Sequence, residues 1–445
     1  MSSFRINNRS AIKTSTILWL FMYLVFFTAP LFPGRGAFGF YMVEWSFFFW
    51  AMILIYLSIL IVLMKGTIIP VKDPIFVVVG IFFSIVIFSI IDSPNKLRSV
   101  LYAGQFIPYF FLMYFAIAIF DNEQKLSRII DAMTFLILIF SLIIIGAAIA
   151  IGSRWELDDF LLNTFNIGIL KMMTFMELPF SILVFRMLND KLTPFRLLVF
   201  LSISIASVLS GSRGTYLIWA LIVFLAVFKS NQLKKKLFIS IFVIIIIFVG
   251  ILSSDYVRER LNLMVVTSEE DFNEKITAFS RVYTAIVAWD TMIAHPFNGS
   301  GMGNLSSFIE DVIKHSKSIP EPMLKYWEST KLYETQTTPL KLGAELGFSG
   351  FIFFFIFYYY LFSRVRKAMK SSSPIYSHKM KNILQGAKIA IIAGFVHNFF
   401  DVSFYNYYSW FYYGIIIAAT RIVSTKESYA STTLQKKLLK GEQSG

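Results

Sequence analysis

The sequence predicts an all-α fold, a polytopic membrane bundle of about twelve transmembrane helices with one large external loop that contains short helices. Of the 445 residues, 56% are hydrophobic and only 15% are charged, whereas charged residues make up about 25% of soluble domains. Apolar runs of about 20 residues, long enough to cross a bilayer, recur along nearly the whole chain. One long polar segment, 254–347, interrupts them.

The apolar runs give the expected spans in chain order. These are 16–33, 46–64, 74–92, 100–120, 130–152, 165–187, 195–212, 214–229, 236–254, 347–364, 384–402 and 405–422. The two runs that flank Arg213 are short for a crossing. All residues, 1–445, are expected to form a single integral membrane domain. The external loop, 254–347, is inserted between its ninth and tenth helices.

The lysines and arginines of the short loops predict the orientation. Every second loop is basic, beginning with the N-terminus and ending with the C-terminal tail. Because basic loops stay on the cytoplasmic side, both termini are expected to be cytoplasmic and 254–347 external. The net charge of +14 follows mostly from this bias. We therefore expect membrane lipid, and no nucleic acid, among the partners.

The most informative stretch is 280–304, within the polar segment. As far as Ala294 it predicts a helix, whose period places four side chains on one face: Arg281, Ala285, Trp289 and Met292. His295 then ends the helix, because a residue that precedes proline is disfavoured in the α conformation. A helix that carries arginine just outside a bilayer is suited to hold an anionic head group.

Glycines follow directly after this helix. Gly299, Gly301 and Gly303 predict a loop whose backbone can approach a ligand closely. His295 is a candidate base, although a histidine at a helix end more often serves as a cap for exposed carbonyl groups. The chain has four histidines and no cysteine, and no metal-ligand spacing occurs. We therefore expect no metal and no cofactor.

Ionisable residues at bilayer depth are functional candidates, because burial of their charge is costly. Arg213 lies in the turn Ser210-Gly-Ser-Arg-Gly214, where small residues leave backbone amides free for an anion. An exposed hairpin arginine is the alternative, and the scarcity of external arginines favours function. His397 and Asp401 share one face at spacing i, i+4, as an orienting pair or as a catalytic relay.

Lys171 and Glu177 share one predicted span. Six residues apart, they point about 120° away from each other, so each needs a partner on another helix or a wet cavity. Lys171 is near the outer end, where snorkelling and a functional role are equally supported. Glu177 precedes Pro179 and lies deeper, so we expect it to line a cavity.

Four motifs in this order resemble the O-antigen polymerase and O-antigen ligase superfamily. They are Ser210-Gly-Ser-Arg-Gly214, the helix from Arg281 to Trp289, His295-Pro-Phe-Asn-Gly-Ser-Gly-Met-Gly303, and Ala344-Glu-Leu-Gly-Phe-Ser-Gly350. Each motif alone is weak, and their order is more specific. The number of spans and the single large external loop also resemble this superfamily.

The resemblance implies an enzyme of the bacterial inner membrane that makes surface polysaccharide, including lipopolysaccharide. Such enzymes transfer an oligosaccharide from undecaprenyl pyrophosphate to an acceptor hydroxyl outside the membrane, without a metal. By resemblance, Arg213 and Arg281 bind the pyrophosphate and stabilise it as it leaves, and a chain-length regulator protein is a further partner. Guanidinium groups suit phosphate oxygens, and charge grows on the leaving group in the transition state.

One departure distinguishes the subfamilies. Ligases carry a histidine, their proposed base, nine residues before the glutamate of the last motif, where this chain has Gln336. Glutamine cannot take a proton at neutral pH, so the departure favours a polymerase over a ligase. It leaves the base open among the nearby carboxylates Glu334, Glu328 and Glu345, of which we favour Glu334. Glu345 is interpreted as a structural residue at a helix start.

A flippase for the same lipids is the competing class. It would also have about a dozen spans and buried charges. Transporters of this kind often show a repeated pattern of spans, which this sequence lacks, and they do not need the arginine helix and glycine loop.

Overall fold

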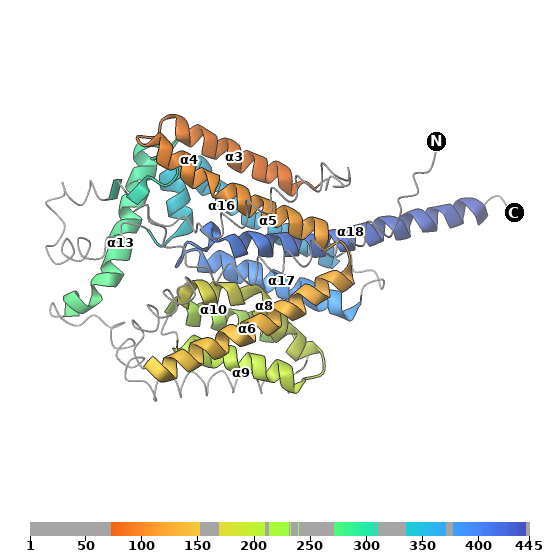
Figure 1. Ribbon diagram of the computed structural model, residues 1–445. Helices are drawn as coiled ribbons and strands as arrows, with labels where there is room; N and C mark the ends of the chain where they lie inside the picture. The colour runs from red at the N-terminus through yellow and green to blue at the C-terminus, as the bar shows by residue number, and fades with distance from the viewer. Residues whose placement is uncertain are drawn as a thin grey trace, which may run out of the picture.

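The computed structural model describes residues 73–151, 169–209, 213–230, 232, 239, 271–306, 308–309, 335–370 and 377–441. These residues form helices and connecting loops, so the expected all-α class is confirmed for them (Figure 1). The helices are α3 (Ile75–Ile91), α4 (Lys96–Gly104), α5 (Phe106–Ile119), α6 (Glu123–Ile151), α8 (Ile169–Asn189), α9 (Pro194–Leu209), α10 (Arg213–Lys229), α13 (Asp271–Ala294), α16 (Thr338–Lys370), α17 (His378–His397), a 3-10 turn at Ser403–Tyr405 and α18 (Tyr407–Gly441).

Several of these helices are apolar enough to lie in a bilayer. Lys96–Ile119, Glu123–Ile151 and Thr338–Lys370 are also long enough to cross one, and α3, α9 and most of α10 are shorter apolar helices. The chain is therefore a multi-pass membrane protein. The spans expected at 16–33 and 46–64, and nearly all of 236–254, lie outside the described residues, so the number twelve stays a prediction.

Two helices differ in form from their predicted spans. The span expected at 100–120 consists of α4 and α5, which meet at Gln105. The span expected at 347–364 belongs to the longer α16, whose backbone leaves the helical conformation at Gly347, with φ 71° and ψ −168°. The segment before Gly347 is polar enough to resemble a loop in the sequence, yet it is buried against its neighbours.

The bundle is held by close helix pairs, with α5 against α18, α8 against α17 and α6 against α9. A Cβ atom at Gly386 of α17 would lie 2.6 Å from the Cα atom of Ile182 in α8. Glycine at this position therefore lets the two backbones approach, as small residues do between membrane helices. This contact brings Glu177 of α8 and His397 of α17 to the same level of the bundle.

A proline lies inside α8 next to the polar site. Pro179 has no N–H to donate to the carbonyl of Phe175, four residues earlier. The Tyr412 hydroxyl of α18 donates a hydrogen bond to that carbonyl instead. In the next turn the Ser181 hydroxyl donates to the carbonyl of Glu177 at 2.7 Å. Freed backbone groups inside a membrane bundle need such partners, and Tyr412 supplies the one that Pro179 cannot.

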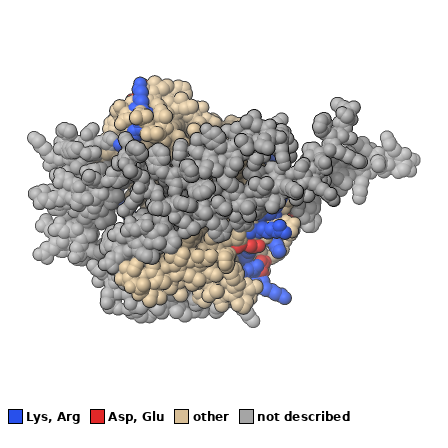
Figure 2. Space-filling view, viewed as in Figure 1, with Lys and Arg blue, Asp and Glu red and all other residues tan. Residues whose placement is uncertain are grey.

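The two ends of the bundle differ. The helix α13 runs across one end, and α18 extends past the bundle at the opposite end (Figure 1). In Figure 2, described basic and acidic side chains gather at the end of the bundle that holds the α8–α9 turn. Ion pairs near that turn include Arg186 with Asp131 and Arg196 with Asp190. The sides of the membrane on which α13 and the C-terminus lie stay a prediction.

Candidate functional site

A buried polar network lies where α16 begins and α17 ends. The side chain of Asn398 accepts hydrogen bonds from the Thr338 hydroxyl at 2.6 Å and the Phe404 amide at 3.0 Å. Its amide group donates to the Tyr358 hydroxyl at 2.8 Å and to the Gly394 carbonyl at 2.6 Å. These bonds satisfy both ends of the Asn398 amide. They fix the start of α16 over the end of α17.

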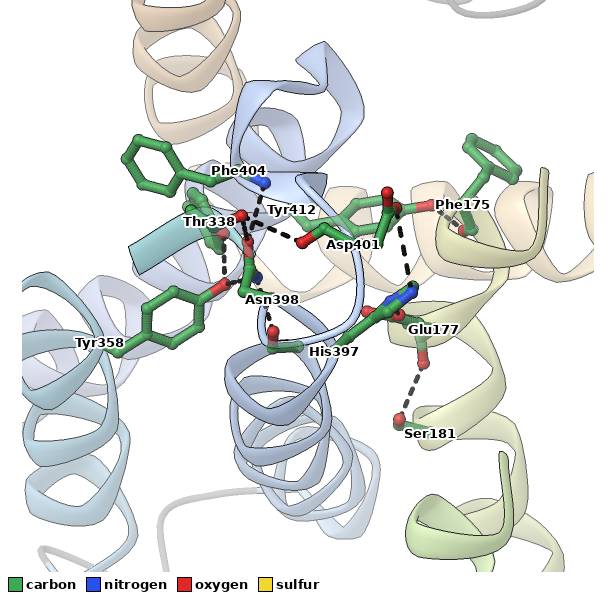
Figure 3. A network of polar contacts seen from close by, with 12 residues as sticks. Phe175, Glu177, Ser181, Thr338, Tyr358, His397, Asn398, Asp401, Phe404 and Tyr412 are labelled. Carbon is green, nitrogen blue, oxygen red and sulfur yellow. Dashed lines mark hydrogen bonds and ion pairs between the residues drawn. The ribbon is translucent and has the colours of Figure 1, made fainter. Parts of the chain in front are cut away.

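Beside this network, three ionisable side chains meet (Figure 3). The Nδ1 atom of His397 is hydrogen-bonded to a carboxylate oxygen of Glu177, and its Nε2 atom lies 3.9 Å from an oxygen of Asp401. The side chains of His397, Glu177 and Asp401 are 5%, 12% and 16% exposed. The sequence paired His397 with Asp401, and the closer partner, Glu177, comes from α8. The sequence predicted that Glu177 needs a partner on another helix or a wet cavity, and His397 of α17 is such a partner.

Two cavities adjoin this trio. One is lined from α8, α9, α10 and α17 and is bounded by Met176, Glu177, Phe180, Ile203, Ser207, Thr215, Ile218, Trp219, Ile222 and His397. The other lies between α8, α16, α17 and α18 and includes Glu177 and Tyr358 in its wall. Glu177 thus lines a cavity, as expected from its place in the span. Its role in substrate binding stays a prediction.

The helices on either side of the turn at 210–212 line the first cavity. Arg213 begins α10, and its side chain is outside the described residues, as is the turn 210–212. Thr215, in the first turn of α10, and Ser207, near the end of α9, both line the cavity. The turn therefore joins two helices whose facing residues form one wall of the cavity.

The arginine helix α13 packs on α16 through one buried face. This face contains Thr284, Val287, Ala288, Thr291 and Met292. Arg281 and Trp289 are exposed, whereas Met292 is buried. The residues that the sequence placed on one face are therefore divided between the buried and the exposed sides of α13. The helix ends at Ala294, as the His295-Pro296 step predicts.

The glycine loop after α13 docks on α16. The amides of Ser300 and Gly301 donate to the carbonyls of Ala344 at 2.7 Å and Glu345 at 3.0 Å. The amide of Phe348 donates to the Pro296 carbonyl at 2.8 Å, at the break in α16. Two motifs that are separate in the sequence therefore form one structural unit.

The three glycines have positive φ angles of 64°, 85° and 77°. A Cβ atom at Gly299 would lie 2.3 Å from the carbonyl carbon of Glu345. Cβ atoms at Gly301 and Gly303 would meet Ser93 and Tyr102 at 2.6 and 2.4 Å. The close approach that the sequence predicted is thus made to the protein itself. Binding of a ligand by this loop stays a prediction.

Asn304 connects the glycine loop to the turn between α3 and α4, a role that was not predicted from the sequence. Its side-chain amide donates to the hydroxyls of Ser93 at 2.6 Å and Ser99 at 2.8 Å, across the turn between α3 and α4. Nearby, the Arg98 guanidinium donates to Ser306. An asparagine after a glycine run gave no signal of this long-range contact.

The remaining predicted residues are more scattered. His295 is exposed, its ring packs edge-on against Phe308, and its backbone N–H and carbonyl bond Thr291 and Gly299. Gln336 is half-buried just before α16. Only the backbone of Lys171 is described, and Glu334 lies outside the described residues.

Glu345 differs from its interpretation at a helix start. It lies in the last turn of α16 before the break at Gly347, is 1% exposed, and accepts a hydrogen bond from the Tyr405 hydroxyl at 3.0 Å. Its position relative to the helix dipole is the reverse of the one expected, and its structural role stays a prediction. Across the described residues, no group of three histidine or acidic side chains is arranged to hold a metal ion.

Comparison with known proteins adds one match. Residues 197–355 match the family model described as O-antigen ligase, which covers a little over a third of the chain. This segment runs from α9 to the middle of α16. It contains both candidate arginines, the glycine loop and Gln336. No curated protein matches the chain.

Proposed function

We propose that this protein is a glycosyltransferase that uses a polyprenyl-pyrophosphate-linked oligosaccharide as donor. The observation that carries the proposal is the match of 197–355 to the O-antigen ligase family model. The matched segment contains Arg213 beside a cavity and Arg281 on the helix that crosses one end of the bundle. Two guanidinium groups would bind the pyrophosphate and stabilise the charge that it gains as it leaves.

We further propose that the reaction is polymerisation. The growing glycan would move from undecaprenyl pyrophosphate to a sugar hydroxyl of a lipid-linked repeat unit, with no metal required. Gln336 supports a polymerase, because it stands where the resembling ligases have their proposed base. Ligation is the second candidate, since the matched model is described as a ligase.

The two arginines are tested by substitution. Arg213→Ala and Arg281→Ala should each abolish polymer while the protein remains in the membrane. Lysine at either position should restore activity only in part, because an ammonium group cannot form the two-pronged contact of a guanidinium. Arg128→Ala is the matched control, since Arg128 is an exposed arginine on α6, away from the cavities. Normal polymer ladders from both alanine variants would contradict the pyrophosphate assignment.

The reaction is tested by deleting the gene. A polymerase deletion should leave single repeat units on the lipid carrier or final acceptor. A ligase deletion would leave finished chains on undecaprenyl pyrophosphate, and a flippase deletion would leave single units on the cytoplasmic side. Purified protein given lipid-linked repeat units and a chelator should form chains. An absolute requirement for a divalent cation would contradict the metal-independent mechanism.

A further inference from the structure

We propose that the cavity between α8, α9, α10 and α17 receives the acceptor hydroxyl, and that His397, oriented by Glu177, takes its proton. The inference rests on the proposed glycosyl transfer. It assigns the general base, for which the sequence suggested Glu334. In the resembling ligases the proposed base is a loop histidine, at the position of Gln336, whereas this base would come from the membrane bundle.

The geometry of His397 fits a base. Glu177 is the partner of Nδ1, so in the neutral ring the proton is on Nδ1 and the lone pair is on Nε2. Among the described residues Nε2 makes no hydrogen bond, and its nearest charged neighbour, Asp401, is 3.9 Å away. A carboxylate that orients one nitrogen while the other accepts a proton is the arrangement used by histidine bases in hydrolases.

The cavity wall supplies polar groups that suit a hydroxylated ligand. The indole N–H of Trp219 is buried and has no hydrogen-bond partner among the described residues, although a buried donor normally has one. Trp219 lines the cavity, and its ring stacks at 5.8 Å on Phe180. The hydroxyl-bearing residues Ser207 and Thr215 line the same wall. An unpartnered donor beside a histidine in a hollow points to a polar guest.

The cavity also lies at the level of the Arg213 backbone. Thr215, in its wall, is two residues from Arg213, or about 3 Å along the axis of α10. A donor whose pyrophosphate is bound by Arg213 would therefore be held at the same end of α10 as the cavity.

The step balances with these groups alone. The acceptor oxygen forms a bond to the anomeric carbon as its proton moves to Nε2 of His397. The bond from that carbon to the pyrophosphate oxygen breaks, and its electron pair leaves with undecaprenyl pyrophosphate. The imidazolium formed is stabilised by Glu177 and Asp401, and it returns its proton to water when the product departs.

A purely structural ion pair is the alternative, and the chain contains one for comparison. Arg364 donates to both oxygens of Asp73, at 2.5 and 2.6 Å, and also to Thr420 and Tyr360. All three nitrogens of that guanidinium donate hydrogen bonds, and it borders neither of the two cavities. His397 differs on both counts, since one nitrogen is unbonded and the ring lines a cavity.

The first test replaces the base. His397→Gln keeps a polar side chain of similar length that cannot take a proton. We expect turnover of lipid-linked repeat units to fall by about 10²- to 10⁴-fold, which is the usual contribution of general acid–base catalysis. Binding of undecaprenyl pyrophosphate should change by less than about threefold. His378→Gln is the matched control, because His378 is the exposed histidine at the other end of the same helix.

The second test separates orientation from simple packing. In Glu177→Gln the amide can donate to Nδ1 and so place the histidine proton on Nε2, which blocks proton uptake there. We therefore expect a loss of turnover close to that of His397→Gln, with KM little changed, and partial recovery in Glu177→Asp. A His397→Gly variant should regain turnover when imidazole is added, since the base itself is restored.

The outcomes separate this inference from the proposed function. If wild-type protein forms no chains and the deletion strain has normal ladders, both proposals are wrong. If wild-type protein is active, Arg213→Ala is inactive and His397→Gln retains activity within threefold, the function stands and the base assignment is wrong. A folded His397→Gly variant that imidazole does not rescue would also overturn the assignment. Loss in both glutamine variants, together with imidazole rescue, would support it.

Discussion

Replacement of Gly299 by alanine tests the docking of the glycine loop on α16. Gly299 has φ +64°, a conformation that costs a side-chain-bearing residue about 1–2 kcal/mol. The added Cβ would lie 2.3 Å from the carbonyl carbon of Glu345 and 2.5 Å from the amide nitrogen of Leu346. Both atoms belong to the backbone, so neither can rotate away. Overpacking of this kind costs about 1–3 kcal/mol more.

The sum of about 3 kcal/mol shifts the docking equilibrium of the loop about 150-fold. Hydrogen exchange measures this shift directly. The amides of Ser300 and Gly301 are bonded to α16 only while the loop is docked, so their exchange should accelerate by about two orders of magnitude. The experiment uses the purified full-length protein without any lipid-linked substrate.

The matched control is Gly146→Ala in α6. An added Cβ there meets nothing within 4 Å, and alanine in a helix interior is favoured over glycine by about 0.5–1 kcal/mol. This variant should be as stable as the wild type or slightly more so. Unchanged exchange at Ser300 and Gly301 in Gly299→Ala would refute the docking argument. It would instead favour a loop whose glycines are required by a ligand.

Two more predictions concern the bundle. Arg364→Ala leaves the Asp73 carboxylate, 3% exposed, without its guanidinium partner, so we expect about 3–5 kcal/mol of destabilisation in thermal unfolding in detergent. Most of this loss should be recovered when Asp73→Ala is added, and equal losses in the single and double variants would contradict the pairing. Tyr412→Phe removes the donor to the Phe175 carbonyl and should cost about 1 kcal/mol. The same change should cost less in a Pro179→Ala background, because the new backbone amide at this position can donate to the Phe175 carbonyl. An identical cost in both backgrounds would refute the idea that Tyr412 replaces the hydrogen bond that Pro179 cannot make.

The sequence by itself determined the class of the protein and much of its local structure. Long apolar runs require helices in a bilayer, because every backbone polar group must be satisfied within the segment. The spans expected at 74–92 and 130–152 correspond to α3 and α6, although α6 begins earlier, at Glu123. The end of α13 at Ala294 also followed from the sequence, since the conformational restriction before proline is local.

Contacts between distant residues could not be read in this way. The break at Gly347 is accompanied by a hydrogen bond from the Phe348 amide to the Pro296 carbonyl. The early start of α16, at Thr338, depends on the burial of a polar segment. Both result from tertiary packing, which local propensity does not report.

The candidate site, too, could be predicted from the sequence only in part. The costs of buried charge marked Glu177 and His397 individually, because each is ionisable within an apolar run. Their pairing, 220 residues apart, was decided by the close approach of α8 and α17, which Gly386 permits. The sequence shows which groups need partners. Only the packed bundle decides which partners they have, because helix–helix contacts depend on shape over several turns at once.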